Sequence, residues 1–239
     1  MSETLYVVMP AYNEEANIRS VLEQWYPVVE RVGGDSRLAA FDDGSRDETL
    51  SIMRAFGEEH PRFQAMTKPN SGHGATLLEA YRYALDAGAD WVFQTDTDGQ
   101  TLPNEFWQLW EARGNCDMAA GWRNSREDGF SRVIVTRTLR LVVRACFGVS
   151  VTDANVPFRL MSAASLRENL AFVPDGFNLT NVALSAAYVK RGMRVRWFPI
   201  TFRPRQGGVN SINLRRIAGI GLRALRDFRP INRAIEAAK

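Results

Sequence analysis

The stretch WVFQTDTDGQ, residues 91–100, decides the fold class, because an apolar run ends there in two closely spaced aspartates. Three further apolar runs, at 5–10, 38–43 and 63–68, also end in polar or turn residues, as the run at 91–96 does. Helical patterns separate the runs at the spacing of repeated strand–helix units. The pattern predicts an α/β fold with a mostly parallel sheet flanked by helices.

Polar residues gather where these predicted strands end, in the segments 10–15, 42–47, 68–74 and 96–100. Ligands of open α/β sheets bind beyond the carboxyl ends of the strands, so we expect one shared site there. Ser45, near the end of the second segment, and Glu48 have the spacing of a capping box, which predicts a helix from that point to about Glu59.

The chain has 239 residues, of which 45% are hydrophobic and 24% charged, and this composition excludes disordered, collagen-like and coiled-coil proteins. Cys116 and Cys146 are too few for a disulfide framework, and the opening MSETLYVVMP lacks the features of a secretory signal. Both observations favour the cytoplasm. The apolar run that begins at Leu139 is interrupted by Arg140 and Arg144, and it is too short to span a bilayer.

The two halves of the chain carry opposite charge. Residues 1–120 contain 9 basic and 20 acidic side chains, whereas residues 121–239 contain 21 basic and 7 acidic ones. A basic half suits phosphates, whether in nucleic acid, in a phosphorylated small molecule or on an anionic membrane surface. Nucleic acid is disfavoured, because no zinc-ligand spacing, aromatic RNA-binding pattern or helix-turn-helix signal accompanies the charge.

Asp96, Asp98 and Gln100 stand at alternate positions directly after an apolar run. Alternate side chains of an extended segment point the same way, and carboxylate and amide oxygens are the ligands that Mg²⁺ or Mn²⁺ prefers. An acidic turn after a strand is the alternative interpretation. The two carboxylates and the amide oxygen are together a candidate metal site.

The segments PAYNEE (10–15) and DDGSRDET (42–49), together with the later D-x-D, resemble family-2 glycosyltransferases of the GT-A fold. That family binds a nucleotide sugar across these strand ends. The resemblance implies that Pro10, Tyr12, Glu14, Asp43 and Asp96 contact the nucleotide sugar. It also implies a metal site at Asp96, Asp98 and Gln100. Asp42 is expected to form a turn, and Asp47 to favour the start of the next helix.

The segment KPNSGHGA (68–75) is a glycine-containing turn that leads into a predicted helix, whose free N–H groups would attract anions. It matches the N-x-G-x-G-A segment of the family, and the resemblance adds Lys68 and Gly74 to the nucleotide-sugar residues. His73 is equally well explained as an exposed turn residue.

The second half resembles the polyprenyl-phosphate branch of that family, typified by dolichyl-phosphate mannose synthase. The resemblance rests on Gly121-Trp122-Arg123, Arg132, Thr136-Arg137, and Asp153 followed by Phe158-Arg159-Leu160. It implies that Arg123, Arg132 and Arg137 surround the acceptor phosphate. It also implies that Asp153 lies beside that phosphate, as a catalytic base or as a group that orients an arginine.

The segment RQGGVNS (205–211) resembles the R-x-x-G-x-S loop of the branch, whose arginine, here Arg205, closes over the diphosphate. The chain departs from the branch at Ile212, where a lysine is usual, and at Asn155-Val156-Pro157, where small residues are usual. Asp153 and Arg205 are therefore the catalytic candidates.

The expected function is inverting, metal-dependent transfer from a nucleotide-diphosphate sugar to a polyprenyl phosphate at the cytoplasmic membrane face, with Mg²⁺ or Mn²⁺. The alternative is a soluble transferase that acts on a saccharide hydroxyl in cell-surface polysaccharide synthesis. We expect one continuous domain, with a nucleotide-sugar half at 1–122 and an acceptor half at 123–239.

Two basic amphipathic segments predict attachment to an anionic membrane surface without a spanning helix. One is the stripe of Arg137, Arg140 and Arg144, and the other is the run 212–228. Packing on the domain itself, a membrane protein partner and an interface between copies of the chain are the alternatives for these segments.

Overall fold

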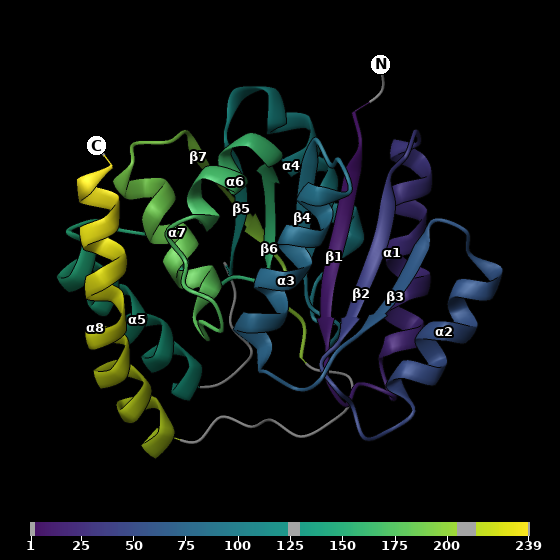
Figure 1. Ribbon diagram of the computed structural model, residues 1–239, viewed down its shortest axis with the longest axis horizontal. Helices are drawn as coiled ribbons and strands as arrows, with labels where there is room; N and C mark the ends of the chain where they lie inside the picture. The colour runs from purple at the N-terminus through teal and green to yellow at the C-terminus, as the bar shows by residue number, and fades with distance from the viewer. Residues whose placement is uncertain (1–2, 124–129, 205–213, 239) are drawn as a thin grey trace.

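The computed structural model describes residues 3–123, 130–204 and 214–238, with the backbone alone at 130–137 and 214–225. Within these residues, one sheet of seven strands runs in the order β3-β2-β1-β4-β6-β5-β7 (Figure 1). Neighbouring strands are parallel except at β6, which is antiparallel to β4 and β5. The strands are β1 (Leu5–Ala11), β2 (Arg37–Asp42), β3 (Phe63–Thr67), β4 (Trp91–Thr95), β5 (Met118–Arg123), β6 (Phe158–Ser162) and β7 (Val195–Ile200).

Helices cover both faces of this sheet, as expected for an α/β fold. In α1 the buried residues recur at helical spacing, from Ile18 through Leu22 and Trp25 to Val29, whereas α7 is buried on all sides from Thr180 to Tyr188. The helices are α1 (Ile18–Val32), α2 (Thr49–Glu59), α3 (His73–Asp86), α4 (Phe106–Ala112), α5 (Phe130–Phe147), α6 (Ala163–Leu170), α7 (Thr180–Lys190) and α8 (Leu214–Ala237), with 3₁₀ turns η1 (Pro103–Glu105) and η2 (Arg113–Asn115).

Strand β4 lies in the middle of the sheet and sends alternate side chains to its two faces. The ring of Phe93 lies 5.2 Å from that of Trp25 in α1 and 4.9 Å from that of Phe106 in α4. Gln94, the next residue, instead accepts a hydrogen bond from Asn181 of α7. One face of β4 therefore packs an aromatic core, while the other presents a buried polar group.

The basic helices α5 and α8 lie side by side at one edge of the molecule (Figure 1). Phe228 of α8 is buried, and its ring lies 5.3 Å from that of Phe147 and 5.6 Å from that of Phe177. Ile231 and Ile235 are buried on the same helix. The last turns of α8 thus belong to the domain core. Among the helices of the described residues, none is both long and apolar enough to cross a membrane.

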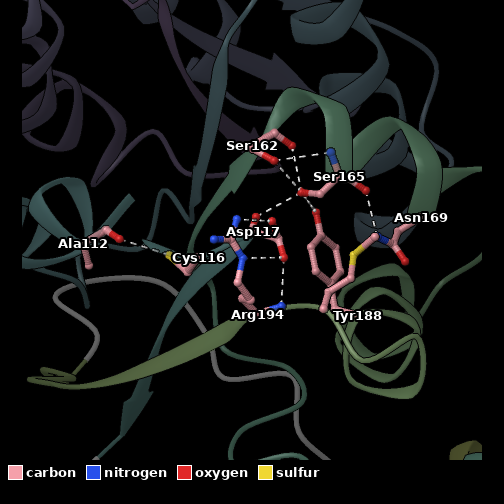
Figure 2. A network of polar contacts seen from close by, with 9 residues as sticks. Ala112, Cys116, Asp117, Ser162, Ser165, Asn169, Tyr188 and Arg194 are labelled. Atoms are coloured by element: carbon pink, nitrogen blue, oxygen red, sulfur yellow. Dashed lines mark hydrogen bonds and ion pairs between the residues drawn. The ribbon is translucent and has the colours of Figure 1, made fainter. Parts of the chain in front are cut away.

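A polar network fixes the end of the sheet where β5 and β7 begin (Figure 2). Asp117 precedes β5, and its carboxylate accepts hydrogen bonds from the Arg194 backbone at 2.8 Å and the Arg194 guanidinium at 2.9 Å. The backbone oxygen of Asp117 accepts from Ser165 Oγ at 3.0 Å, and Ser165 Oγ lies 2.9 Å from the hydroxyl of Tyr188. These contacts join β5 and β7 to α6 and α7.

The expected capping box at Ser45 is wrong. Helix α2 begins at Thr49 and Ser45 does not cap it, because Ser45 Oγ accepts from the backbone N–H of Asn13 at 2.9 Å. Trp122 and Arg123 belong to β5, where they pair with β7. The expected boundary between residues 122 and 123 falls inside β5. Division into a nucleotide half and an acceptor half stays a prediction.

Candidate functional site

A cavity of about 540 Å³ opens where β1, β2 and β4 end. The four polar segments expected to meet at this edge do meet there. The cavity is lined by Pro10, Ala11, Tyr12, Glu14, Asp43, Asn70, Gly72, His73, Thr76, Asp96, Thr97 and Asp98.

The segment after β1 is fastened to the segment after β2. Asn13, with a positive φ of 53°, donates its backbone N–H to Ser45 Oγ at 2.9 Å, and its side-chain oxygen accepts from the Arg46 backbone at 2.9 Å. The Glu14 backbone N–H donates to Thr49 Oγ1 at 2.8 Å. The hydroxyl groups of Ser45 and Thr49 thus accept hydrogen bonds from the segment after β1, and these bonds hold that segment beside the cavity.

This fastening presents Pro10, Tyr12 and Glu14 to the cavity, as expected. The Pro10 carbonyl accepts from Thr97 Oγ1 at 2.9 Å, which joins the end of β1 to the aspartate segment. Tyr12 is 44% exposed, whereas Glu14 is buried and accepts a 2.8 Å hydrogen bond from Asn17. An exposed aromatic ring at a cavity is available to stack on a planar ligand.

Asp42 and Asp43 have different environments. Asp42 accepts from the Ser45 backbone at 3.0 Å and from Thr67 Oγ1 at 2.9 Å, so its expected role as a turn former is confirmed. Asp47 accepts from the backbone of Thr49, the first residue of α2, at 3.1 Å, as its expected position at the start of that helix requires.

Asp43 organises the glycine-containing segment. Its carboxylate accepts hydrogen bonds from Lys68 Nζ at 2.5 Å and from the backbone N–H groups of Ser71 and Gly72, each at 2.9 Å. Burial raises the pKa of Asp43, but the hydrogen bond from Lys68 and those from Ser71, Thr76 and Gly72 outweigh burial and lower it overall. The carboxylate is therefore ionised at neutral pH and holds this segment beside the cavity.

The two glycines of this segment serve different purposes. Gly72 lines the cavity with φ at 91°, a conformation that favours glycine. A Cβ on Gly74 would lie 2.3 Å from the carbonyl oxygens of Phe177 and Asn178. Gly74 is thus required where α3 packs on the segment before α7, and its contact with a nucleotide stays a prediction. Lys68 donates a hydrogen bond to Asp43, which lines the cavity.

Asp96 and Asp98 both line the cavity. Desolvation, followed by repulsion from Asp98 and Glu14, raises the pKa of Asp96 well above its ordinary value, although Arg123 and Arg159 act in the opposite direction. His73 Nε2 lies 3.9 Å from Asp96 Oδ1, which places this histidine at the site. Crowded carboxylates of this kind favour a bound cation.

Gln100 makes a two-way bridge to the end of β7. Its Nε2 donates to the Arg203 carbonyl at 2.6 Å, and the Arg203 backbone N–H donates to the Gln100 carbonyl at 2.9 Å. The extended strand ends at Thr95, and Gly99 turns the chain with φ at 71°, so simple alternation does not reach Gln100. Gln100 is buried, and its role as a metal ligand stays a prediction.

Arg123, at the end of β5, and Asp153 form a bidentate ion pair. Nε and Nη2 of Arg123 each donate to one carboxylate oxygen of Asp153 at 2.8 Å. The Arg123 guanidinium also lies 5.1 Å from the centre of the Phe202 ring, and Asp153 is buried. The aspartate therefore fixes the position of the arginine.

Arg159 of β6 is fully buried. Its guanidinium donates to the Val156 carbonyl at 2.8 Å, to the Ala154 carbonyl at 3.4 Å and to the Asn181 carbonyl at 3.1 Å. Ala154 and Val156 follow Asp153 directly, so Arg159 holds the segment that carries the aspartate. This explains the Phe-Arg-Leu motif in structural terms.

Three expected residues cannot be located in the site. Arg132 and Arg137 belong to α5, but their side chains lie outside the described residues, as does Arg205 in the segment 205–213. Sequence reasoning also missed Gln94, Thr97 and Asn181. A polar residue within an apolar strand was the available signal for Gln94, whereas no local signal marks Asn181 in α7.

Solved structures of glucosyl-3-phosphoglycerate synthase from Mycobacterium tuberculosis share this fold, and the expected GT-A fold is confirmed. A complex with UDP aligns with a TM-score of 0.69 and 20% identity, over 96% of this chain and 80% of that one. TarS from S. aureus aligns with a TM-score of 0.57 and 17% identity, over 82% of this chain and 58% of that one.

Two kinds of curated relative are similar in sequence. Undecaprenyl-phosphate 4-deoxy-4-formamido-L-arabinose transferase of Pseudomonas paraeruginosa is 26% identical over 197 residues, which are 77% of this chain and 57% of that protein. Polyprenol monophosphomannose synthase of Mycolicibacterium smegmatis is 25% identical over 216 residues, 87% of this chain and 80% of that protein. The chain spans about half the length of the arabinose transferases. The sequence matches Glycosyl transferase family 2 over residues 6–185, and the chain belongs to that family.

Proposed function

We propose that this chain transfers a sugar from a nucleoside-diphosphate sugar to a polyprenyl phosphate, with inversion at the sugar and with help from Mg²⁺ or Mn²⁺. The observation that carries the proposal is the cavity at the strand ends, which Asp96 and Asp98 line together with Asp43 and the glycine-containing segment. The relatives named above, a transferase to undecaprenyl phosphate and a polyprenol monophosphomannose synthase, support this acceptor.

The donor set fits a divalent cation. Asp96 and Asp98 supply carboxylate oxygens, and the repulsion that raises the pKa of Asp96 would be relieved by a cation. Within the part of the chain that the structure describes, no group of three or more His, Cys, Asp or Glu residues forms a metal cluster. Mg²⁺ and Mn²⁺ sites of this type take one or two carboxylates and complete their coordination with phosphate oxygens and water. When bound, the cation would neutralise charge on the leaving diphosphate.

Residues of the cavity wall would hold the donor. The exposed ring of Tyr12 is available to a nucleobase, and the ionised carboxylate of Asp43 keeps the backbone of Ser71 and Gly72 in place beside it. In this proposal Asp96 and Asp98 lie at the diphosphate. Arg205 would approach the same phosphates.

A phosphate acceptor changes what the protein must supply. A phosphate monoester has a second pKa near ~6 and is largely a dianion at neutral pH, so it needs little help from a base. It needs cations that orient it, and Arg123 is held in one position by Asp153. We therefore assign Asp153 the role of orienting Arg123. Arg132 and Arg137 are the further acceptor candidates.

A basic, partly apolar surface on α5 supports work at the cytoplasmic face of a membrane. Arg140 and Arg144 are exposed, and Leu141 between them is 67% exposed. With residues 150–152 they line a shallow cavity of about 390 Å³. Exposed leucine flanked by arginines is typical of helices that rest in the headgroup layer of anionic membranes.

The direct experiment offers the purified chain radiolabelled nucleotide sugars with undecaprenyl phosphate and follows label into the organic phase. We expect label from at least one UDP- or GDP-sugar, loss of transfer in excess EDTA, and a loss of about a hundredfold or more in kcat for Asp98→Asn. Asp86→Asn, which removes an exposed carboxylate of α3, is the matched control and should retain activity. Label on a free saccharide but not on lipid would contradict the proposed acceptor, and full activity in EDTA would contradict the metal.

A further inference from the structure

Three polar side chains, one each from α3, α7 and β4, form a series of hydrogen bonds that ends on the carboxylate of Asp96. Tyr81 of α3 donates its hydroxyl to Asn181 Oδ1 at 2.9 Å, and Asn181 Nδ2 donates to Gln94 Oε1 at 3.1 Å. Gln94 Nε2 then donates to Asp96 Oδ1 at 3.0 Å. The three side chains thus form a head-to-tail series of donors that begins at a helix and ends at the cavity.

The direction of this series is fixed by its first member. Burial raises the pKa of Tyr81, so the phenol stays protonated and donates. Asn181 must then accept with its oxygen and donate with its nitrogen, and Gln94 must do the same. Reversing both amides would turn the Gln94 carbonyl toward a carboxylate. Tyr81, Asn181 and Gln94 are all buried, so water does not readily replace a lost partner.

Asn181 also serves the acceptor side through its backbone. Its carbonyl accepts from Arg159 Nη1 at 3.1 Å, and Arg159 stands directly opposite Gln94 in the β4–β6 pairing. Arg159 in turn holds the carbonyls of Ala154 and Val156, which follow Asp153. Asn181 therefore contacts both Gln94, which bonds to Asp96, and Arg159, which holds the segment after Asp153.

We infer that Gln94 and Asn181 are positioning residues, which orient the Asp96 carboxylate toward the divalent cation and the diphosphate. The inference rests on the proposed function. Neither side chain lines the cavity, so each acts through Asp96 and touches no substrate. Groups that orient a metal-binding side chain commonly change metal affinity or activity by about 10-fold to 100-fold when they are replaced.

The test measures Mn²⁺ binding by electron paramagnetic resonance with UDP present, and again with GDP, in the absence of acceptor. Gln94→Met keeps the length of the side chain and removes its donor, and we expect Mn²⁺ affinity to fall about 10-fold to 100-fold. Tyr81→Phe removes one oxygen and leaves both amides, so it should fold and lose less affinity than Gln94→Met. The KM for lipid acceptor should stay unchanged in both variants.

Asn169→Leu is the matched control. Asn169 is a fully buried amide of α6, it donates to the Ser165 carbonyl at 2.7 Å, and it lies at the far end of the sheet (Figure 2). This variant should lose stability and keep Mn²⁺ affinity. The inference is overturned if Gln94→Met binds Mn²⁺ as tightly as the original chain, or if Asn169→Leu weakens binding equally. If the original chain binds no Mn²⁺ with either nucleotide, the metal of the proposed function fails first and the inference falls with it.

Discussion

Arg123 and Asp153 form a bidentate pair, with two hydrogen bonds of 2.8 Å between the guanidinium and the carboxylate. The aspartate is buried and the arginine is largely buried, so the protein itself fixes the geometry of the pair. A carboxylate that uses both oxygens in this way is poorly placed to accept a proton from a substrate. It is well placed to set the direction in which an arginine meets a phosphate.

Single and double replacements of Arg123 and Asp153 distinguish the two candidate roles of Asp153, which are a catalytic base and a group that orients Arg123. We expect Arg123→Ala to raise the KM for lipid phosphate about 10-fold to 100-fold, with a much smaller effect on the KM for nucleotide sugar. Asp153→Asn should act in the same direction, and the double variant should be little worse than Arg123→Ala, because both changes remove one unit. Steady-state kinetics with both substrates varied give these values. A fall in kcat for Asp153→Asn that adds to the effect of Arg123→Ala would point to a base.

The ion pair at the far end of the sheet predicts a pH dependence of stability. Arg194, chiefly through its side-chain hydrogen bond, lowers the pKa of Asp117 in the folded chain. The stabilisation is complete above the unfolded pKa of about 3.9 and is lost as the pH falls through the lower folded value. Asp117→Asn should therefore lower Tm at pH 7, and the difference from the original chain should shrink below about pH 4. Thermal melts from pH 3 to pH 7 would contradict this if the difference were constant.

The close packing of Gly74 predicts a cost for the smallest possible side chain. A Cβ there would lie 2.3 Å from two carbonyl oxygens, so Gly74→Ala must move the backbone of Phe177 and Asn178. We expect a loss of about 1–3 kcal/mol in the free energy of unfolding. Gly114→Ala is the control, because nothing lies within 4 Å of its Cβ position. Urea denaturation measures both, and equal stability of the two variants would show that the α3 contact is loose.

The exposed surface of Arg140, Leu141 and Arg144 predicts binding to anionic vesicles at low salt. Each arginine near such a surface contributes about 1 kcal/mol, so Arg140→Gln with Arg144→Gln should weaken binding by roughly tenfold or more. Arg19→Gln with Arg54→Gln removes the same charge from exposed positions of α1 and α2 and should have little effect. Flotation with and without anionic lipid distinguishes these outcomes. Activity on detergent-dispersed lipid without any vesicle binding would favour a membrane protein partner.

The first half of the fold was accessible from sequence because its signals are local. Four apolar runs and their polar ends predict β1 to β4 within one or two residues, and the edge at which those ends meet follows from parallel pairing. Strand β6 was not predicted, because it carries Arg159 at a position that points into the core. An arginine is rarely fully buried, and the partners that make it so lie in α7 and before β6.

Long-range hydrogen bonds explain what sequence reasoning missed in the site. The role of Gln100 as a metal ligand stays a prediction, but no local signal showed that its amide nitrogen donates to the carbonyl of Arg203, which is 103 positions away. Asp43 was expected at the nucleotide, and it lines the cavity, but its carboxylate is engaged by Lys68 and the backbone that follows. Residue type and spacing can identify which side chains gather, whereas the partner of each donor is set by the tertiary fold.

The hydrogen bonds from Tyr81 to Asn181 and from Asn181 to Gln94 have a consequence for the order in which the protein is made. Asp96, Asp98 and the other residues of the cavity wall leave the ribosome before α7 is synthesised. Until α7 packs on the sheet, Gln94 and Tyr81 lack these partners, and the amide that faces Asp96 is free to turn. The nascent chain therefore acquires its binding residues early and their final orientation late, when about three-quarters of the chain has been translated.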